Sequence, residues 1–210
     1  MKNFIYLILI ATLISSCAIS RKIPYNNLKL ELPQLTTKSI SIAVWDQREQ
    51  VLNGSRKPDF VGYLRSVAGI AYPLGTASGK AFADDIALDI STSFQNNGCK
   101  AIVVPTSYKD NENIILNNLK ESNNDKLILV KCNELHTDGY ADQGLFFKLQ
   151  VSIYRANGTL IGQKSFNGAK PLGKGMKFET YLPKGLEELI KEVFNDPTVN
   201  SALNDISSEQ

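Results

Sequence analysis

The sequence has little histidine, little charge imbalance and no long hydrophobic run, and each shortage excludes a class of protein. His136 is the single histidine, which excludes most metal sites built from several histidines and argues against histidine-based catalysis. The 23 basic and 21 acidic residues give a net charge of +2, whereas nucleic-acid-binding proteins usually carry a clearly basic face. The apolar run at residues 4–14 is too short to span a bilayer, which needs roughly 20 residues.

The amino terminus has the organisation of a secretory signal. A weakly positive start (MKN) precedes the apolar run, which ends in Ile14-Ser15-Ser16-Cys17. This ending resembles a bacterial lipobox, in which the cysteine thiol receives a diacylglycerol and the chain is cut before the cysteine. Ala18 follows, instead of the aspartate that commonly retains such lipoproteins in the inner membrane. We therefore expect lipidation of Cys17 and anchoring in the outer membrane, facing the periplasm. The alternative is an ordinary signal peptide with a chance cysteine.

The remaining chain divides into a tether, one domain and a tail. Pro24 and Pro33 disfavour helix near the amino terminus, and the alternation of Leu28, Leu30 and Leu32 predicts a short edge strand there. The end of the chain is polar. The predicted organisation is a signal peptide at 1–16, a lipid-attached tether at 17–37, a domain at 38–196 and a flexible tail at 197–210.

Hydrophobic periodicity predicts five strands and three helices in the domain. The clearest helix follows Ser78, which can cap it, and ends at Asn97-Gly98. Asp110 or Asn111 is expected to cap the second helix, and Pro183 and Gly185 to break the start of the third. The predicted strands are 39–46, 101–105, 125–135, 145–155 and 159–167, and the predicted helices are 79–97, 111–121 and 176–195.

Two connections are distinctive. Residues 47–78 hold several glycines and prolines and are predicted to form a long irregular loop, a kind of segment that is usually functional or disordered. Asn157-Gly158 predicts a type I′ turn between the last two strands.

The element order β-α-β-α-β-β-β-α predicts an α/β (α+β) fold with a single mixed sheet of about five strands and three covering helices. The first three strands are expected to be parallel, because helices link them, and the last two to form an antiparallel hairpin. This order is similar to that of the amino-terminal domain of TolB, of LpoB and of the curli lipoprotein CsgG, a resemblance that implies a fold and no function.

A second resemblance lies in residues 44–94. Val44-Trp45-Asp46-Gln47-Arg48, then Phe60-Val61-Gly62, then Thr76-Ala77-Ser78-Gly79 before a helix resemble outer-membrane lipoproteins of the YajG type. The resemblance implies a fold and a location more than a mechanism.

Asp46 and Arg48 follow the first predicted strand, at the sheet edge where α/β proteins bind ligands. Arg48, joined by Arg65 and Lys80, is a candidate for gripping a carboxylate or phosphate. The alternative is a structural salt bridge from Asp46 to Arg48 or Arg65. The apolar residues after this strand form a candidate contact surface, or else pack on their own sheet; they are Phe60, Val61, Tyr63, Leu64, Val67, Ile70 and Tyr72.

Other possible sites are weak. Residues 75–81 lack the spacing and the Ser/Thr of a phosphate-binding loop, so no nucleotide is expected. Asp84, Asp85 and Asp89 are expected on a solvated helix face, with no metal, and His136 in a surface turn. Cys99 and Cys132 are predicted to be buried free thiols, because a parallel sheet would separate them too far for a disulfide. Catalytic carboxylates are supported by position alone; the candidates are Asp46, Asp59 and Glu134.

The sequence predicts a non-catalytic binding or assembly accessory of the bacterial envelope, without a cofactor. Its expected partners are the membrane, through the lipid on Cys17, and an envelope protein or cell-wall polymer. Two alternatives remain open: a hydrolase acting on glycan or peptidoglycan, and a structural subunit of an oligomeric envelope machine.

Overall fold

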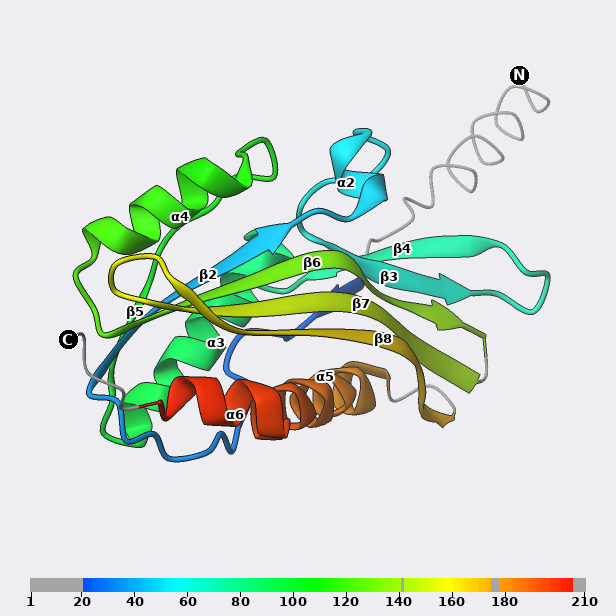
Figure 1. Cartoon of the computed structure of the whole chain (residues 1–210). Helices are drawn as coiled ribbons and strands as arrows, with labels where there is room; N and C mark the ends of the chain where they lie inside the picture. Colours follow the sequence, from blue (N-terminus) through cyan, green and yellow to red (C-terminus); the bar gives the residue numbers. More distant parts are fainter. Residues whose placement is uncertain (1–20, 141, 175–177, 206–210) are drawn as a thin grey trace, which may run out of the picture.

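The structure is a computed structural model that describes residues 21–140, 142–174 and 178–205. The predicted signal peptide and Cys17 lie outside the described residues. Within the described ranges the chain forms one mixed α+β unit with an eight-stranded sheet and five helices (Figure 1). The strands are β1 (Arg21–Ile23), β2 (Ser39–Asp46), β3 (Phe60–Arg65), β4 (Ala71–Thr76), β5 (Lys100–Val103), β6 (Lys126–Gly139), β7 (Asp142–Arg155) and β8 (Leu160–Lys174). The helices are α2 (Glu49–Leu52), α3 (Phe82–Asn96), α4 (Glu112–Glu121), α5 (Phe178–Asn195) and α6 (Pro197–Leu203).

The five predicted strands are present and make up one branch of the sheet, in the order β5-β2-β6-β7-β8. As predicted, β2 pairs in parallel with β5 and β6, and β7 and β8 form an antiparallel hairpin. The sheet has eight strands because β1, β3 and β4 add a second branch. This branch joins β6 farther along, where Gly62 of β3 pairs with Thr137.

The predicted irregular loop at 47–78 is therefore wrong: it contains α2 and the β3–β4 hairpin. Glycine and proline are ordinarily poor strand residues, and here each has a special position. Gly62 lies at a register shift between β3 and β4, with a φ of +149°. Pro73 lies outside the stretch of β4 that pairs with β1, which covers Leu74 to Thr76.

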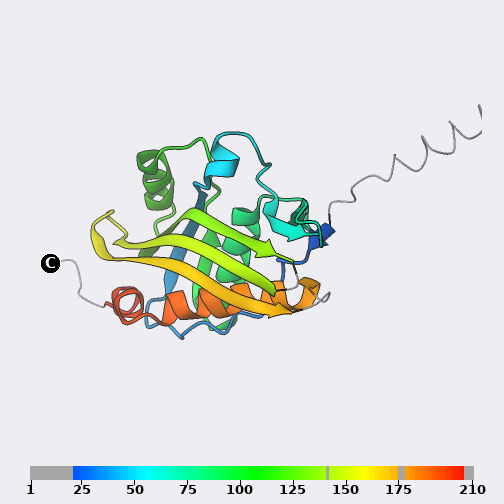
Figure 2. The same ribbon diagram turned by 90° about the vertical axis from the view of Figure 1, so that its right-hand side faces the viewer.

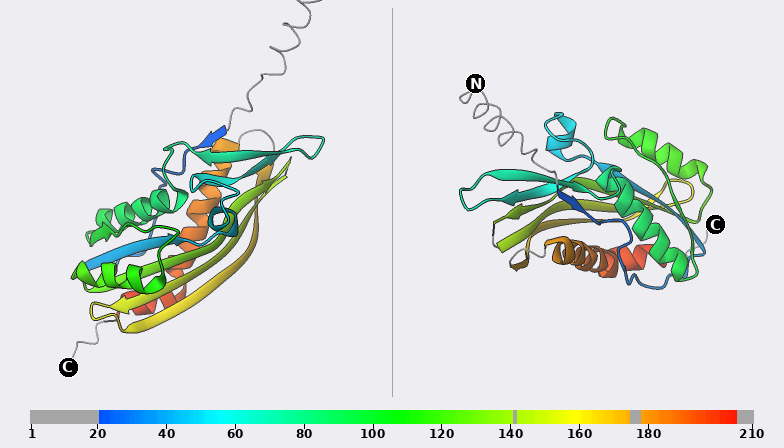
Figure 3. Two further views of the ribbon diagram at one scale, coloured as in Figure 1. Left: turned by 90° about the horizontal axis from the view of Figure 1, so that it is seen from above. Right: turned by 180° about the vertical axis from the view of Figure 1, so that it is seen from behind.

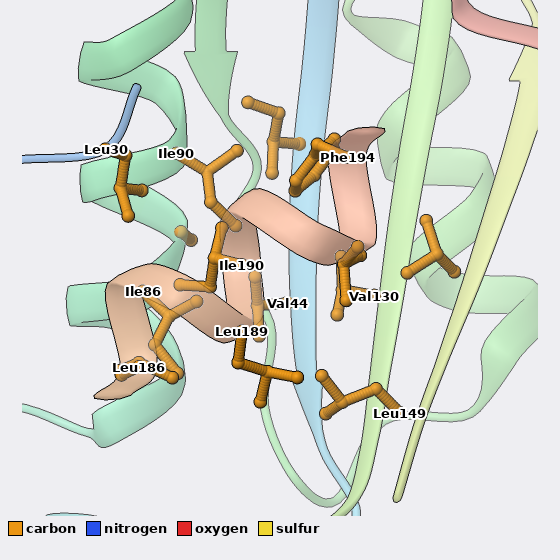
Figure 4. Packing of buried hydrophobic residues seen from close by; sticks show 14 of the residues in the cluster. Leu30, Val44, Ile86, Ile90, Val130, Leu149, Leu186, Leu189, Ile190 and Phe194 are labelled. Atoms are coloured by element: carbon orange, nitrogen blue, oxygen red, sulfur yellow. The ribbon is translucent and has the colours of Figure 1, made fainter. Parts of the chain in front are cut away.

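Helices cover both faces of the sheet (Figures 2 and 3). On one face, α3, α5 and α6 pack on the main apolar cluster, with Ile86 and Ile90 of α3 opposite Leu186 and Ile190 of α5 (Figure 4). This cluster encloses an apolar cavity of about 20 Å³. On the other face, α4 buries Ile115 and Leu119 against a smaller cluster around Trp45. Strand β2 is buried on both faces, as is usual for a parallel strand between helix layers.

Both ends of the described chain pack on the domain. The strand predicted around Leu30 is absent; instead β1 pairs with β4, and Ile23 and Tyr25 are fully buried. Leu30 and Leu32 are buried without strand pairing. The segment predicted as a tether thus belongs to the fold from Arg21 onward. At the other end, residues 197–203 of the predicted flexible tail form α6 instead, which is capped by Asp196 and buries Val199 and Leu203.

Several predicted boundaries need correction. Helix α3 begins at Phe82, and Ser78 bonds to Asp85 instead of capping the helix. The β7–β8 turn is not type I′, because Gly158 alone has a positive φ and its N–H donates to Arg155, which gives a three-residue loop with glycine last. Helix α5 runs through Pro183 without a break. Asn111 caps α4 as predicted.

Candidate functional site

Asp46 and Arg48 form a buried ion pair at the point where the sheet forks. Arg48 Nε donates to Asp46 Oδ1 over 2.8 Å, and Arg48 Nη2 donates to Asp46 Oδ2 over 2.7 Å. Strand β2 pairs with β6 up to Cys132, and β3 takes its place beside β6 farther on. The guanidinium fills the space where one strand leaves and the other arrives.

The remaining donors of Arg48 bond to main-chain carbonyls around the fork. Its Nη1 donates to the carbonyl oxygen of Phe60 over 2.6 Å and to that of Leu135 over 3.3 Å. Its Nη2 also donates to Pro58 over 3.2 Å, and the ring of Phe82 lies 5.4 Å from the guanidinium carbon. Arg48 thus ties the start of β3 to β6 and to the end of β2.

Burial sets the electrostatics of this pair. Arg48 is 2% exposed and Asp46 is 4% exposed. Loss of water by itself lowers the pKa of Arg48, but the hydrogen bonds and charge of Asp46 outweigh it and raise that pKa above its ordinary value. The neighbouring Cys132 thiol is fully buried, and this burial raises its pKa to about 12. Arg48 is therefore a permanent cation that is buried and leaves no surface for a ligand. This matches the structural salt bridge between Asp46 and Arg48 that the sequence offered as the alternative to ligand binding.

The other predicted ligand-binding residues do not gather around Arg48. Arg65 makes its own two-pronged pair with Asp138, at 2.6 Å for both Nε–Oδ1 and Nη2–Oδ2. The Tyr63 hydroxyl accepts from Arg56 over 3.2 Å, Leu64 packs at the border of the core, and Lys80 is exposed. The predicted cluster of Arg48, Arg65 and Lys80 is therefore not brought together.

The apolar residues of the β3–β4 region separate into two groups. Phe60 and Val61 are buried at the base of the hairpin. Near its turn, Val67 is 84% exposed, Ile70 is 57% exposed and Tyr72 is 42% exposed. Phe60 and Val61 therefore pack on their own sheet, which was one of the two predictions for these residues. The exposed residues remain candidates for contact with a partner.

Two aspartates of α3, Asp85 and Asp89, are buried, contrary to prediction, whereas Asp84 is exposed as predicted. Asp89 accepts hydrogen bonds from the main-chain N–H groups of Asn27 at 2.9 Å and Leu28 at 3.1 Å. Burial raises the pKa of Asp89 from 3.8 to about 6, although these two bonds oppose the shift. Asp85 is buried beneath Ser78, and burial likewise raises the pKa of Asp84 and Asp85. Asp89 holds the amino-terminal segment on the domain.

His136 and the cysteines have structural surroundings. His136 lies within β6 and not in a turn, with its ring stacked on Phe146 at 5.3 Å, and burial lowers its pKa. Cys99 and Cys132 are buried free thiols, as predicted. Across the described ranges, no group of three potential ligands is arranged to hold a metal ion, and no helix is long and apolar enough to cross a membrane.

The sequence does not indicate the roles of three residues in this part of the molecule. Asp138, the partner of Arg65, lies 73 positions away along the chain, and only the pairing of β3 with β6 brings the two together. Asp89 bonds to main-chain groups about 60 positions earlier, which leave no trace in side-chain patterns. Tyr140 is 50% exposed at the end of β6, where periodicity gives no signal.

Comparisons with known proteins give no family for the chain. No family model and no curated protein matches it. Solved structures with some likeness include protein XCC0632 from Xanthomonas campestris, which is 13% identical with a TM-score of 0.46 over 83% of this chain and 91% of that chain. Lipoprotein GNA1162 from Neisseria meningitidis is 13% identical, with a TM-score of 0.32 over 76% of this chain and 99% of that chain. The C-terminal domain of LpoB from Salmonella enterica is 12% identical, with a TM-score of 0.30 over 66% of this chain and 87% of that chain.

These neighbours include lipoproteins, but at such TM-scores the likeness carries no argument about this chain. The resemblance to YajG-type lipoproteins stays a prediction.

Proposed function

We propose that this protein is an outer-membrane lipoprotein, anchored through Cys17 and facing the periplasm, that acts as a non-catalytic binding or assembly accessory in the bacterial envelope. The lipobox-like sequence Ile14-Ser15-Ser16-Cys17 supports the anchor. The structural observation that carries the proposal is the short connection between anchor and domain. Arg21 is already part of β1, so four residue steps separate Cys17 from the sheet.

The non-catalytic part of the proposal rests on the Asp46–Arg48 pair. This carboxylate and guanidinium stand at the carboxyl end of a parallel strand, where an α/β protein would place reacting groups. Their hydrogen bonds are directed into the protein, and both residues are buried. A hydrolase would need two carboxylates facing one open cleft, which Asp46 does not supply.

The proposed partners are the membrane, through the lipid on Cys17, and an envelope protein or cell-wall polymer. The proposal includes no nucleic acid, nucleotide or cofactor. The near-neutral charge argues against nucleic acid.

The test is a crosslinked pull-down of the full chain from intact bacterial envelopes, compared with Cys17→Ala, together with mass spectrometry of the amino-terminal peptide. We expect acyl chains on Cys17 and a crosslinked partner that is lost in the variant. An unmodified Cys17 would contradict the anchor. A modified Cys17 with no crosslinked protein or wall polymer would contradict the accessory role and direct attention to hydrolysis.

A second candidate, the structural subunit of an oligomer, is favoured by strand β8. This strand runs from Leu160 to Lys174 and pairs with β7 alone among the strands described, so its other edge has no strand neighbour. Open edges of this length can pair between copies. Light scattering on the purified full chain separates a monomeric accessory from an oligomeric subunit.

A further inference from the structure

The hairpin formed by β3 and β4 ends in an exposed apolar tip. We use the term hairpin tip for Val67, Ile70 and Tyr72, which are 84%, 57% and 42% exposed. Tyr140 is also half exposed, and it lies at the same end of the molecule because β6 runs parallel to β3 from the Gly62–Thr137 pair onward (Figure 1). Apolar side chains gathered at one end of a domain are typical of an interaction surface.

The anchored end of the chain lies beside this hairpin. Strand β1 is parallel to β4, with Arg21 opposite Leu74 and Ile23 opposite Thr76. Strand β4 starts at Ala71, near the tip, and runs away from it. Because β1 is parallel to β4, Arg21 is the end of β1 that is nearer to the tip, and the preceding chain is attached there. The amino-terminal connection and the hairpin tip therefore share one end of the domain.

Covalent geometry then fixes how close the lipid must be. Four residue steps between Cys17 and Arg21 span at most about 14 Å when fully extended. Along β4, the three residue steps from Leu74 back to Ala71 cover about 10 Å. An acylated Cys17 is thus held within reach of the level of the tip, and the tip is held close to the bilayer.

The charge of the surrounding sequence fits a lipid surface. No acidic residue occurs between Asp59 and Asp84, a stretch that contains the whole hairpin. No acidic residue occurs between Cys17 and Glu31 either. The carboxylates at the same end of the domain are paired with cations, Asp138 with Arg65 and Asp142 with Lys174. A segment without carboxylates avoids repulsion from anionic headgroups, and tyrosine suits the boundary between water and lipid.

We propose that the hairpin tip rests in the headgroup region of the membrane that carries the Cys17 lipid, so that the domain is held in one orientation. This proposal builds on the anchor assigned under the proposed function. The bilayer then covers Val67, Ile70 and Tyr72, while the turn between β7 and β8, at the opposite end of the molecule, points into the periplasm (Figure 1).

The experiment places a fluorophore at each end of the full acylated chain, purified from bacterial membranes and reconstituted in phosphatidylethanolamine–phosphatidylglycerol vesicles. Val67→Cys reports on the tip, and Leu160→Cys, exposed to 48% beside the β7–β8 turn, is the matched control. Acylation blocks Cys17, and Cys99 and Cys132 are buried, so a polarity-sensitive label reacts at the new cysteine. We expect a blue-shifted emission at position 67, quenched by nitroxide-labelled lipid, and no such change at position 160.

Three outcomes would overturn the proposal in different ways. If the labels at both positions emit as in water, in protein that floats with the vesicles, the domain is anchored without contact between the tip and lipid. A label at position 67 that is in water on vesicles but shielded in native envelopes would show that the tip binds a protein instead. A chain without acyl groups that fails to float would remove the anchor, and the proposed function would fall together with the docking geometry.

A second variant separates contact from mere proximity. Val67→Ser combined with Ile70→Ser alters exposed side chains only, so folding is expected to be unchanged. In this background a label at Tyr72→Cys should lose its blue shift and its quenching by lipid. Retention of both would show that the anchor alone brings this region to the bilayer, which contradicts a role for the apolar tip.

Discussion

Two arginine–aspartate pairs in this protein have similar geometry and very different surroundings. Arg48 and Asp46 are almost completely buried, whereas the side chain of Arg65 beside Asp138 is 41% exposed. Removing one partner of a buried pair leaves an uncompensated charge away from water, while an exposed charge remains hydrated. The two pairs therefore differ in what they contribute to stability.

Asp46→Asn is expected to lower the free energy of unfolding by about 3–5 kcal/mol, because Arg48 then keeps its charge without a counter-ion. Equilibrium unfolding in urea measures the loss. The matched control is Asp138→Asn, which should cost at most about 1 kcal/mol because Arg65 stays in contact with water. Equal losses for the two variants would contradict the structural role of the buried pair.

Asp89 makes the stability of the fold depend on pH. Its pKa is about 6 in the folded protein against 3.8 for an ordinary aspartate, so the folded chain binds more protons between these values. Stability from this group is therefore greatest at low pH and falls as the pH rises through the window from about 4 to about 6. Burial opposes the carboxylate, and the charges of Asp85 and Glu187 add to the effect.

Asp89→Asn is expected to flatten the decline in stability between pH 4 and pH 7, as measured by urea unfolding at a series of pH values. The decline should not vanish, because burial also raises the pKa of Asp84 and Asp85. Leu88→Ala, an exposed neighbour on the same helix, serves as the control and should keep the wild-type slope. A slope unchanged in Asp89→Asn would show that this carboxyl does not titrate in the window.

At the scale of elements, sequence periodicity located the branch of the sheet whose strands are rich in β-branched and apolar residues. Strand β2 has the predicted bounds, and β5, β6, β7 and β8 overlap their predicted ranges. The hairpin of β3 and β4 was missed because Gly62 and Pro73 have the composition of a loop. Gly62 pairs with Thr137, and β4 pairs with the short β1, and both partners are distant in sequence.

The candidate site likewise has a part that the sequence predicts and a part that it does not. The period-two spacing of Asp46 and Arg48 was visible in the sequence, and so was the salt bridge as one reading of it. The deciding fact was the burial created by β3 and β6, whose carbonyl oxygens at Phe60 and Leu135 complete the guanidinium's partners. Long-range pairing of this kind has no local sequence signal.

Gly62 is expected to be essential for docking the hairpin on β6. A Cβ at this position would lie 2.3 Å from the carbonyl oxygen of Thr137, and the φ of +149° is itself unfavourable for alanine. Gly62→Ala should therefore cost at least about 3 kcal/mol through strain and overlap together. Hydrogen exchange should show faster exchange across β3 and β4.

The control for this variant is Gly54→Ala, which also has a positive φ, of +75°, but has open space where the Cβ would lie. It should cost about 1–2 kcal/mol from the backbone alone. Similar losses for both variants would mean that backbone strain, and not contact with Thr137, explains the requirement for glycine at position 62.

At the scale of the whole molecule, residues 21–32, which the sequence places in the lipid-attached tether, pack on the domain. Only the residues between Cys17 and Arg21, here called the stalk, then connect the expected anchor to the domain. Tyr25 is buried, with its ring 4.8 Å from that of Phe82, and Asp89 holds the next turn of chain. An anchored Cys17 keeps the domain close to the membrane, because only the residues from Cys17 to Arg21 separate the two. The hairpin tip then meets lipid at a high effective concentration.

Lengthening this stalk should release the tip. Insertion of 20 Gly/Ser residues between Ser20 and Arg21 gives a linker with a root-mean-square length of about 25 Å. The tip offers few apolar side chains, so its contact depends on the short stalk, and a label at Val67→Cys should return largely to water while the acylated protein still floats with vesicles. An inserted stretch of the same length in the β7–β8 turn, next to Asn157, should leave the label in lipid. If the stalk insertion leaves it there too, the tip binds the bilayer through its own affinity and the length of the stalk is irrelevant to orientation.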